Sequence, residues 1–233
     1  DGVEEALGFD VNGLKIMKYQ GSVSDFAYLN YLPSNASSFA NSQNSLVHDF
    51  DNDGKMEIVF TNSFFDSDGV QNTSVNIYEQ VSGNSFTLLF HEEYPLVIKG
   101  DNLSLGDFNG DGQKEIAVGF STDLAIPVKL FSVLFIKSLG SNSFSEYSSI
   151  EFFNSNPQSE ISSKTGDTDN DGKDELIISE SNNLYIVKYN QSANKFEPVF
   201  FKEGINSYNS ITYDFDNNGI KEVGINSADS LIF

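Results

Sequence analysis

"DFDNDGKME" (residues 49–57) places four acidic side chains and one glycine within nine positions, directly ahead of the apolar run Ile58-Val59-Phe60. Carboxylates that lie close together repel one another unless a cation lies between them. A strand with this much negative charge at its start therefore indicates a segment that folds around a bound cation.

The same pattern occurs four times, so the chain contains an internal repeat. The other copies are DFNGDGQKE (107–115), DTDNDGKDE (167–175) and DFDNNGIKE (214–222). Each copy has Asp or Asn at positions 1, 3 and 5, Gly at position 6, Glu at position 9 and then a short apolar run. Self-similarity at an interval of some tens of residues predicts stacked units of one supersecondary structure.

The motif supplies the ligands that a hard cation requires. Oxygen side chains at positions 1, 3 and 5 converge when the chain curls, and glycine at position 6 permits the positive φ of that curl. Calcium takes six to eight oxygen ligands, so we predict about four structural calcium ions, with the carbonyl at position 7 as a further ligand. The predicted ligand residues are Asp49, Asp51, Asp53, Lys55, Glu57, Asp107, Asn109, Asp111, Gln113, Glu115, Asp167, Asp169, Asp171, Lys173, Glu175, Asp214, Asp216, Asn218, Ile220 and Glu222.

Two other interpretations of the motif are less favourable. Asp, Asn and Gly are common turn residues, so solvated turns without metal have a similar composition, but four copies with one ligand spacing argue against this interpretation. An EF-hand or dockerin loop begins in the same way but needs an acid at position 12 and a helix after it. Position 12 is apolar in every copy, namely Phe60, Val118, Ile178 and Ile225.

The segments around the loops predict β-strands. Those that follow the loops, such as EIVFTN (57–62) and ELIISE (175–180), are apolar on both faces and rich in β-branched residues, as inner strands are. Two later strands and one strand before each loop complete four strands per unit, and no long helical period is present. The sequence therefore predicts an all-β protein, a β-propeller of four-stranded antiparallel blades in a single domain over residues 1–233. A tandem β-sandwich is the alternative, but its repeats are longer.

The two ends of the chain predict partial blades. Residues 14–20 and 25–32 are two late strands, and residues 210–215, 221–226 and 230–233 are early ones. Pairing of these segments would close a ring with four recognisable blades. The alternative is an excerpt from a longer propeller of about seven blades, which fits a chain that starts at Asp1 without Met.

The D-x-D-x-D-G-x-x-E motif between the first two strands of a blade resembles the FG-GAP repeat of integrin α-subunit propellers. It is also similar to the VCBS repeats of microbial surface proteins. The resemblance covers nearly the whole chain and implies a calcium-stabilised, extracellular propeller. The nearest approach to the F-G and G-A-P elements is VGFSTDLAIP (118–127), so integrin ligand binding and heterodimerisation are not implied.

Composition excludes several classes of function. A net charge of -21 without any arginine makes nucleic acid and anionic membrane surfaces poor partners and cations good ones. The absence of cysteine excludes disulfides, thiolate metal sites and a cysteine nucleophile. No apolar stretch approaches the ~18 residues of a membrane span. His48 and His91 are the only histidines, and neither belongs to a recognisable catalytic motif, so we do not predict an enzyme.

These observations predict a secreted or cell-surface module that mediates adhesion or recognition of an extracellular protein or glycan. Modules that bind calcium at roughly 10⁻⁴ to 10⁻³ M suit the extracellular fluid. The alternatives are a structural subunit of a surface filament or layer, which includes a homo-oligomer, and an accessory domain of a secreted hydrolase.

We expect a partner to bind the connections at the end of the blades opposite the calcium loops. Within them, Phe64 and Phe65 are candidates for an exposed aromatic platform for a ligand, although packing of these rings against a neighbouring blade is the favoured interpretation. The predicted connections are residues 30–44, 61–74, 95–102, 120–129 and 153–160.

Overall fold

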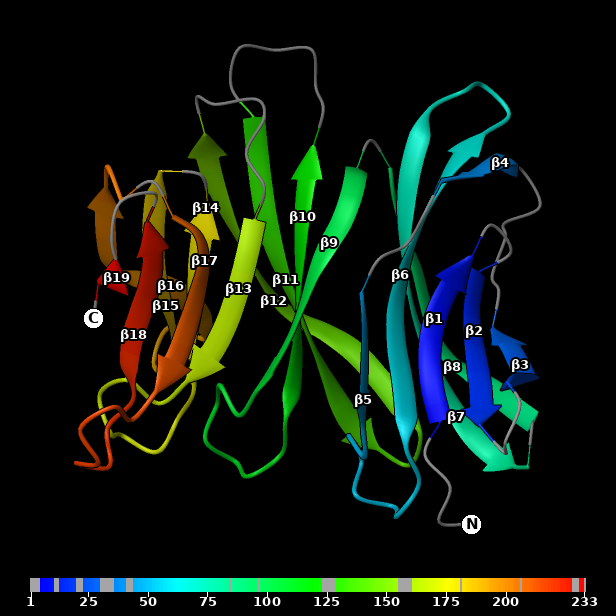
Figure 1. Ribbon diagram of the computed structural model, residues 1–233, viewed down its shortest axis with the longest axis horizontal. Helices are drawn as coiled ribbons and strands as arrows, with labels where there is room; N and C mark the ends of the chain where they lie inside the picture. The colour runs from blue at the N-terminus through cyan, green and yellow to red at the C-terminus, as the bar shows by residue number, and fades with distance from the viewer. Residues whose placement is uncertain are drawn as a thin grey trace. The chain divides into compact units, whose positions relative to one another are not determined.

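The computed structural model folds the chain into antiparallel β-sheets (Figure 1). Among the residues it describes, no helix has the length and apolarity of a transmembrane span. The described residues are 5–10, 13–19, 23–29, 36–40, 44–83, 85–95, 97–122, 129–154, 161–180, 182–205, 207–227 and 231–232.

Two sheets come from the N-terminal part of the chain. The first contains β1 (Glu5–Asp10), β2 (Gly13–Tyr19) and β3 (Val23–Leu29) in that order. The second contains β4 (Ala36–Ala40), β5 (Ser45–His48), β6 (Glu57–Asp66), β7 (Gln71–Ser82) and β8 (Ser85–Pro95). β4 and β5 pair with successive halves of β6, so together they fill the place of one interrupted first strand.

Three further sheets follow, and their strands are adjacent in sequence order. The third sheet contains β9 (Val97–Gly106), β10 (Glu115–Thr122), β11 (Lys129–Gly140) and β12 (Ser143–Asn154). The fourth contains β13 (Ile161–Gly166), β14 (Glu175–Glu180), β15 (Asn183–Asn190) and β16 (Lys195–Glu203). The fifth contains β17 (Ser207–Tyr213), β18 (Glu222–Ser227) and β19 (Leu231–Ile232). The two four-stranded sheets confirm the predicted antiparallel units.

The strands that follow the acidic loops are inner strands, as the sequence predicts. All six residues of β14 are buried, and the first eight residues of β6 are also buried. An inner strand covered on both faces carries apolar side chains on both, which explains the continuous apolar runs.

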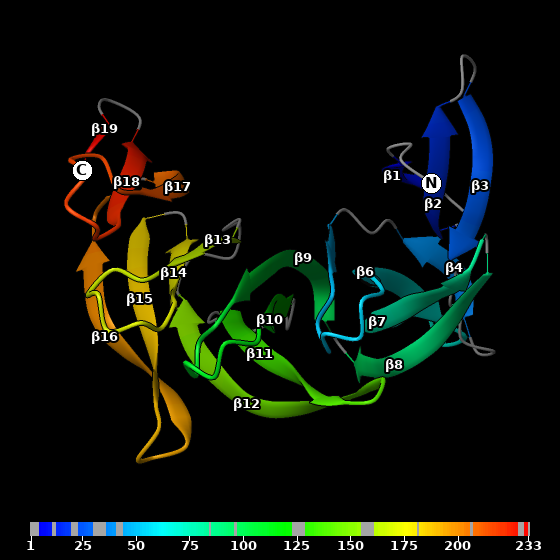
Figure 2. The ribbon, with the colours of Figure 1, turned by 90° about the horizontal axis from the view of Figure 1, so that it is seen from below.

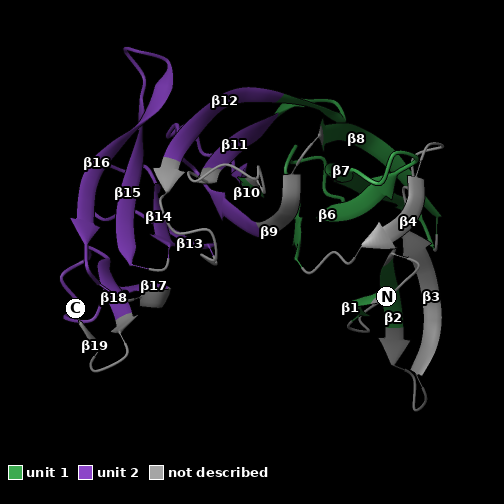
Figure 3. Ribbon diagram, turned by 90° about the horizontal axis from the view of Figure 1, so that it is seen from above, with its two compact units in different colours: residues 1–101, 121–124, 138–145 green, residues 102–120, 125–137, 146–233 purple. Residues whose placement is uncertain are grey.

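The chain divides into two compact units (Figure 3). The first unit comprises residues 1–101, 121–124 and 138–145, and the second comprises residues 102–120, 125–137 and 146–233. Each unit has its own core. That of the first unit is formed by Leu14, Ile16, Ile58 and Phe60. The predicted single propeller domain over residues 1–233 stays a prediction.

Aromatic rings dominate the core of the second unit. Phe135 of β11 stacks on Phe196 of β16 with ring centroids 3.4 Å apart, and Phe108 meets both rings edge-on. These residues come from two successive sheets, so each sheet covers a face of its neighbour.

The first strands of successive sheets in the second unit are joined by a hydroxyl ladder. The Thr165 hydroxyl on β13 donates to the Leu105 carbonyl on β9, at 2.7 Å. The Thr212 hydroxyl on β17 donates to the Thr165 carbonyl, at 2.8 Å. The same bond therefore recurs from sheet to sheet, which brings the acidic loops of this unit side by side at one end of their strands (Figure 1).

The predicted closing blade is wrong. β18 pairs with β17 on one edge and β19 on the other, and β2 pairs with β1 and β3. A strand has only two edges, so the terminal segments form two separate sheets and do not share one blade. The sequence prediction missed β1, which occupies the edge of β2 that was expected to pair with the C-terminal strands.

Several predicted connections are strands instead. Residues 61–74 belong mainly to the ends of β6 and β7, which continue to a turn at residues 67–70. Residues 97–102 belong to β9, and residues 36–40 form β4. Residues 95, 120–122, 129 and 153–154 belong to the ends of β8, β10, β11 and β12. Residues 30–35, 41–43, 96, 123–128 and 155–160 of the predicted connections lie outside the described residues.

Candidate cation-binding loops

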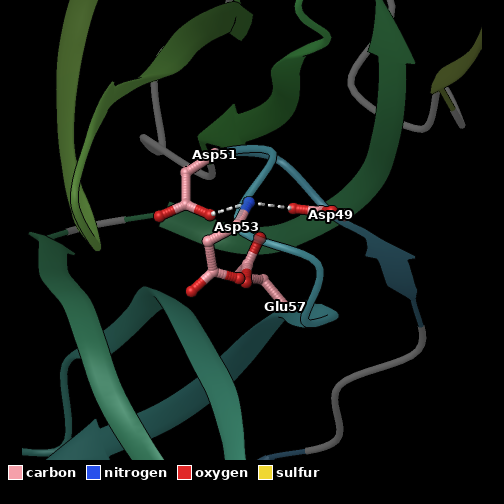
Figure 4. A group of neighbouring side chains, drawn as sticks. All are labelled: Asp49, Asp51, Asp53 and Glu57. Atoms are coloured by element: carbon pink, nitrogen blue, oxygen red, sulfur yellow. Dashed lines mark hydrogen bonds between the residues drawn. The ribbon is translucent and has the colours of Figure 1, made fainter.

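Loop 1 (residues 49–57) joins β5 to β6 and brings its four acidic side chains together (Figure 4). Asp49, Asp51, Asp53 and Glu57 each offer one carboxylate oxygen, and these oxygens all lie within 4.8 Å of one another. This arrangement supplies the converging oxygens that the motif predicts for a cation.

Main-chain hydrogen bonds to the first aspartate hold the curl of loop 1. The Asp53 N–H donates to Asp49 Oδ1 at 3.1 Å, and the Gly54 N–H donates to Asp49 Oδ2 at 3.0 Å. Gly54 has φ of 89°, a left-handed conformation that glycine adopts without steric cost. The predicted role of glycine at position 6 is therefore confirmed.

Loop 2 (107–115), loop 3 (167–175) and loop 4 (214–222) have the same internal bonds. In each, the position 1 carboxylate accepts from the position 6 N–H, and the position 9 glutamate accepts from the position 2 N–H. The first bond measures 2.9 Å in loops 2 and 3 and 2.8 Å in loop 4. The second measures 2.9, 2.8 and 2.8 Å in the same order. One sequence pattern thus produces one loop geometry four times.

Most predicted ligands converge within each loop. Groups of carboxylates with oxygens within 4.8 Å of one another also occur in the other three loops, and their members are Asp107, Asp111, Glu115; Asp167, Asp169, Glu175; and Asp214, Asp216, Glu222.

Some predicted ligands have other contacts. Asp171 lies outside the group of loop 3 and pairs with Lys188. The Asn109 amide donates to Glu115, whereas its oxygen accepts from the Asp111 N–H. At position 7, the N–H groups donate to the position 5 side chains, and ligation by the carbonyls of Lys55, Gln113, Lys173 and Ile220 stays a prediction.

The glutamates that close loops 1 and 2 are buried among carboxylates. Burial raises the pKa of Glu57 to about 7, and the charges of Asp51 and Asp49 contribute to this rise. Burial likewise raises the pKa of Glu115 to about 7, with a contribution from Asp111. Burial, with a smaller contribution from the neighbouring carboxylates, therefore destabilises the charged form of both glutamates.

One buried carboxylate oxygen tests whether the residues fit a cation. Glu57 Oε2 accepts from the Phe50 N–H at 2.7 Å, but Glu57 Oε1 has no hydrogen-bond partner among the described residues. A buried charged atom without a partner is costly unless a cation or a donor meets it. The donor set of loop 1 consists of oxygens only, which fits a hard cation such as Ca²⁺.

Lysine side chains approach two of the loops, and the sequence prediction did not include them as partners. Lys55 Nζ lies 2.9 Å from Asp53 Oδ2 and 3.0 Å from Glu79 Oε2. Lys188 contacts Asp169 and also lies 2.9 Å from Asp171 Oδ2. Lys55 belongs to loop 1 itself, whereas Lys188 lies on β15, and only strand register could have revealed that Lys188 is close to loop 3.

A partial fifth copy of the motif was also missed. Asp1, Gly2 and Glu5 match positions 5, 6 and 9, and an apolar run follows them. Glu5 begins β1 and lies opposite Lys18 of β2. The first four residues lie outside the described part of the chain, but the short D-G-x-x-E signal was legible in the sequence.

The predicted aromatic platform is wrong for Phe64. This side chain is fully buried in β6, and Phe65 beside it is half-buried. The strand continues past the point where the sequence predicts a connection, so Phe64 faces the interior. The nearby Asp66 closes the turn that follows, since its carboxylate accepts from the Val70 N–H at 2.9 Å.

The two histidines have local contacts. The His48 ring meets Phe50 edge-on with centroids 5.1 Å apart. His91 Nδ1 lies 2.8 Å from Asn76 Oδ1, and Nε2 lies 3.3 Å from Glu93 Oε1.

Antiparallel sheets that repeat along the chain, with an acidic loop between the first two strands, define a class of β-repeat proteins. The model of the FG-GAP-like repeat family matches residues 49–118 and 167–225, which contain all four loops and more than half of the chain. The chain therefore belongs to the FG-GAP-like repeat family. A search of the curated proteins found no match. FG-GAP repeats form propeller-like domains and are common in extracellular proteins.

Proposed function

We propose that this chain is part of a calcium-stabilised extracellular β-propeller that mediates adhesion or recognition of a protein or glycan. Calcium has a structural role in this proposal, and the sheets carry the binding surface. The family assignment supports the propeller architecture. The four loops support the metal.

The observation that carries the proposal is the partnerless oxygen of Glu57, among the described residues, within a group of four carboxylates. Bringing like charges together in a partly dehydrated loop is unfavourable without a counter-charge. A calcium ion held by Asp49, Asp51, Asp53 and Glu57 would supply two positive charges and meet the open oxygen. Glu175 Oε1 of loop 3 likewise has no hydrogen-bond partner among the described residues, and the convergence of carboxylates recurs in all four loops.

Chelation tests the metal directly. We expect EDTA to lower the melting temperature sharply and excess CaCl₂ to restore it, because a ligand that binds only the folded state stabilises that state. Magnesium is the control, since its smaller octahedral shell fits a loop with many carboxylates less well. A melting curve that is the same in EDTA and in calcium would contradict the proposal.

Recognition requires a separate test. In a propeller of this type, the strand ends remote from the loops would meet the partner, and the turn at residues 67–70 is a described part of that end. We expect the calcium-loaded chain to bind a defined subset of a glycan array or of surface-exposed proteins. Loss of that binding in EDTA, followed by recovery in calcium, is the expected result.

A structural subunit of a surface assembly is the second candidate, and one strand supports it. β16 is the outermost strand of its sheet (Figure 2) and exposes Val199, Phe200 and Phe201. Apolar side chains on an edge strand favour strand-to-strand association. Sedimentation velocity over a range of concentrations tests this candidate. A monomer at all concentrations would exclude it.

A further inference from the structure

Loop 3 differs from loop 1 because a lysine side chain lies within its acidic group. Lys188 of β15 contacts Asp169, lies 2.9 Å from Asp171 Oδ2 and lies 3.4 Å from Glu175 Oε1. Its side chain is only 20% exposed. One ammonium group therefore meets three carboxylates that come from positions 3, 5 and 9 of the motif.

The strand register explains why only one of these two loops receives a lysine in this way. In the second sheet, Glu57 of β6 lies opposite Glu79 of β7. In the fourth sheet, Leu176 lies opposite Val187, which places Lys188 opposite Glu175 one step further along the antiparallel pair. The position across from the closing glutamate is therefore acidic beside loop 1 and basic beside loop 3.

The closing glutamates differ in their charged neighbours. Glu57 Oε1 and Glu175 Oε1 both lack a hydrogen-bond partner among the described residues, but Lys188 Nζ lies 3.4 Å from the Glu175 oxygen. Glu175 Oε2 accepts from both the N–H and the hydroxyl of Thr168, and Glu175 Oε1 is in ion-pair range of Lys188. Loop 1 therefore retains an open oxygen for a cation, whereas both oxygens of the loop 3 glutamate have a positive or donor neighbour.

Lys55 does not have the same effect on loop 1. Its side chain is 43% exposed, and its ammonium pairs with both Asp53 and Glu79. Its charge is therefore shared with Glu79, the additional acidic residue opposite Glu57. Loop 3 has a lysine at the same motif position, Lys173, so the lysine at position 7 is common to both loops. The difference between them lies in the residue opposite the closing glutamate.

We propose that the Lys188 ammonium is a built-in counter-cation of loop 3, which a calcium ion must displace in order to bind. This proposal rests on the proposed calcium-binding function. Loop 3 then binds calcium more weakly than loop 1, because the ion must break the ion pairs of Lys188 and approach against its charge. Loop 3 also keeps its fold at calcium concentrations that leave it empty, so the calcium requirement of the chain is graded from loop to loop.

The test is a calcium titration of the full chain by isothermal titration calorimetry, with wild type, Lys188→Met and Lys195→Met compared. Methionine keeps most of the length of the side chain and removes its charge. Lys195 is the control because it is exposed and pairs with Glu197 on its own strand. We expect Lys188→Met to move one site from the weak class to the tight class, with a gain of at least about tenfold in affinity, and Lys195→Met to match wild type.

Two further measurements assign the gained site and keep the test valid if one variant folds poorly. Asp169→Asn in the Lys188→Met background should remove the gained site, and Lys188→Gln should reproduce the gain. In EDTA, Lys188→Met should melt below wild type, because loop 3 loses the ammonium that neutralises its acidic group. Addition of calcium should remove that difference.

The outcomes separate this inference from the proposed function. Equal isotherms for wild type, Lys188→Met and Lys188→Gln, with calcium bound in each, would overturn the role of Lys188 and leave the calcium sites intact. Absence of calcium binding in every variant would overturn the proposed function as well.

Discussion

The glutamate at motif position 9 has both a structural and an electrostatic role in the loops. Each copy accepts the N–H of position 2 and so closes the loop without a cation. In loop 1 this role buries a carboxylate beside three aspartates. The same side chain therefore organises the loop and creates the charge density that attracts a cation.

Glu57→Gln is expected to have opposite effects in the two metal states. In EDTA the variant should melt above wild type, because it removes a buried charge whose pKa is raised to about 7. In calcium it should melt below wild type, because a carboxylate ligand is lost. Differential scanning calorimetry in both buffers measures the two shifts. Glu197→Gln, on the exposed β16, is the control, and its melting temperature should match that of wild type in both buffers.

The metal-free chain should become less stable as the pH rises from about 4.5 to about 7. The pKa of Glu57 and of Glu115 is raised to about 7 in the folded state, so between these limits the folded chain binds more protons than the unfolded chain. Stability therefore falls with rising pH through this window and levels off above it. Melting temperatures in EDTA from about pH 4.5 to 8 measure the trend.

The double variant Glu57→Gln/Glu115→Gln isolates these two groups from the rest of the negative charge. In EDTA, the melting temperature of this variant should fall less steeply with pH than that of wild type. An equally steep fall would assign the whole effect to other carboxylates. With saturating calcium the trend should reverse, because protons compete with the ion for the same oxygens.

At the scale of the strand, the apolar runs after each loop were sufficient to predict β6, β10, β14 and β18, and the loops themselves were predicted residue by residue. The ends of β6 could not be predicted in the same way. Ser63 is buried in that strand beyond the predicted segment 57–62, although polar residues of this kind are typical of connections. The sequence therefore predicted a connection where tertiary packing extends the strand.

The first strand of the N-terminal sheet was missed for a related reason, whereas β2 and β3 were predicted. β1 is short and carries Gly8 and two acidic ends, so its β propensity is low, and it becomes a strand through pairing with β2. Lys188 illustrates a similar limit at the site. Its position beside loop 3 depends on the register between β14 and β15. The spacing of residues within one loop does not predict that register.

Two phenylalanines at motif position 2 test how neighbouring sheets stabilise one another. Phe108 is fully buried against Phe135 and Phe196, whereas Phe215 is 39% exposed. We expect Phe108→Ala to lower the free energy of unfolding by about 3–5 kcal/mol. Phe215→Ala should cost about 1 kcal/mol or less. Urea denaturation in saturating calcium measures both, and equal losses would contradict the packing difference.

For the whole molecule, the division into two compact units places loop 1 in the first unit and the other three loops in the second. Loss of one site should therefore weaken the unit that contains it more than the other unit. Asp49→Asn should reduce amide hydrogen-exchange protection mainly in β5 to β8. The matched variant Asp107→Asn should reduce it mainly in β9 to β11.

Mass-spectrometric hydrogen exchange in calcium resolves these segments. A uniform loss of protection along the whole chain after either substitution would show that the two units open as one. Local loss would show that each loop stabilises its own surroundings, as expected for repeat proteins with nearest-neighbour interactions.

The hydroxyl ladder in the second unit has a consequence for how such chains change during evolution. Thr165 and Thr212 donate to main-chain carbonyls of the preceding first strand, and every residue type provides such a carbonyl. A duplicated or deleted repeat can therefore join its new neighbour through this bond without matched substitutions on the accepting side. Gene segments that encode such repeats would tolerate gain or loss of whole copies by recombination more readily than a junction that depends on complementary side chains.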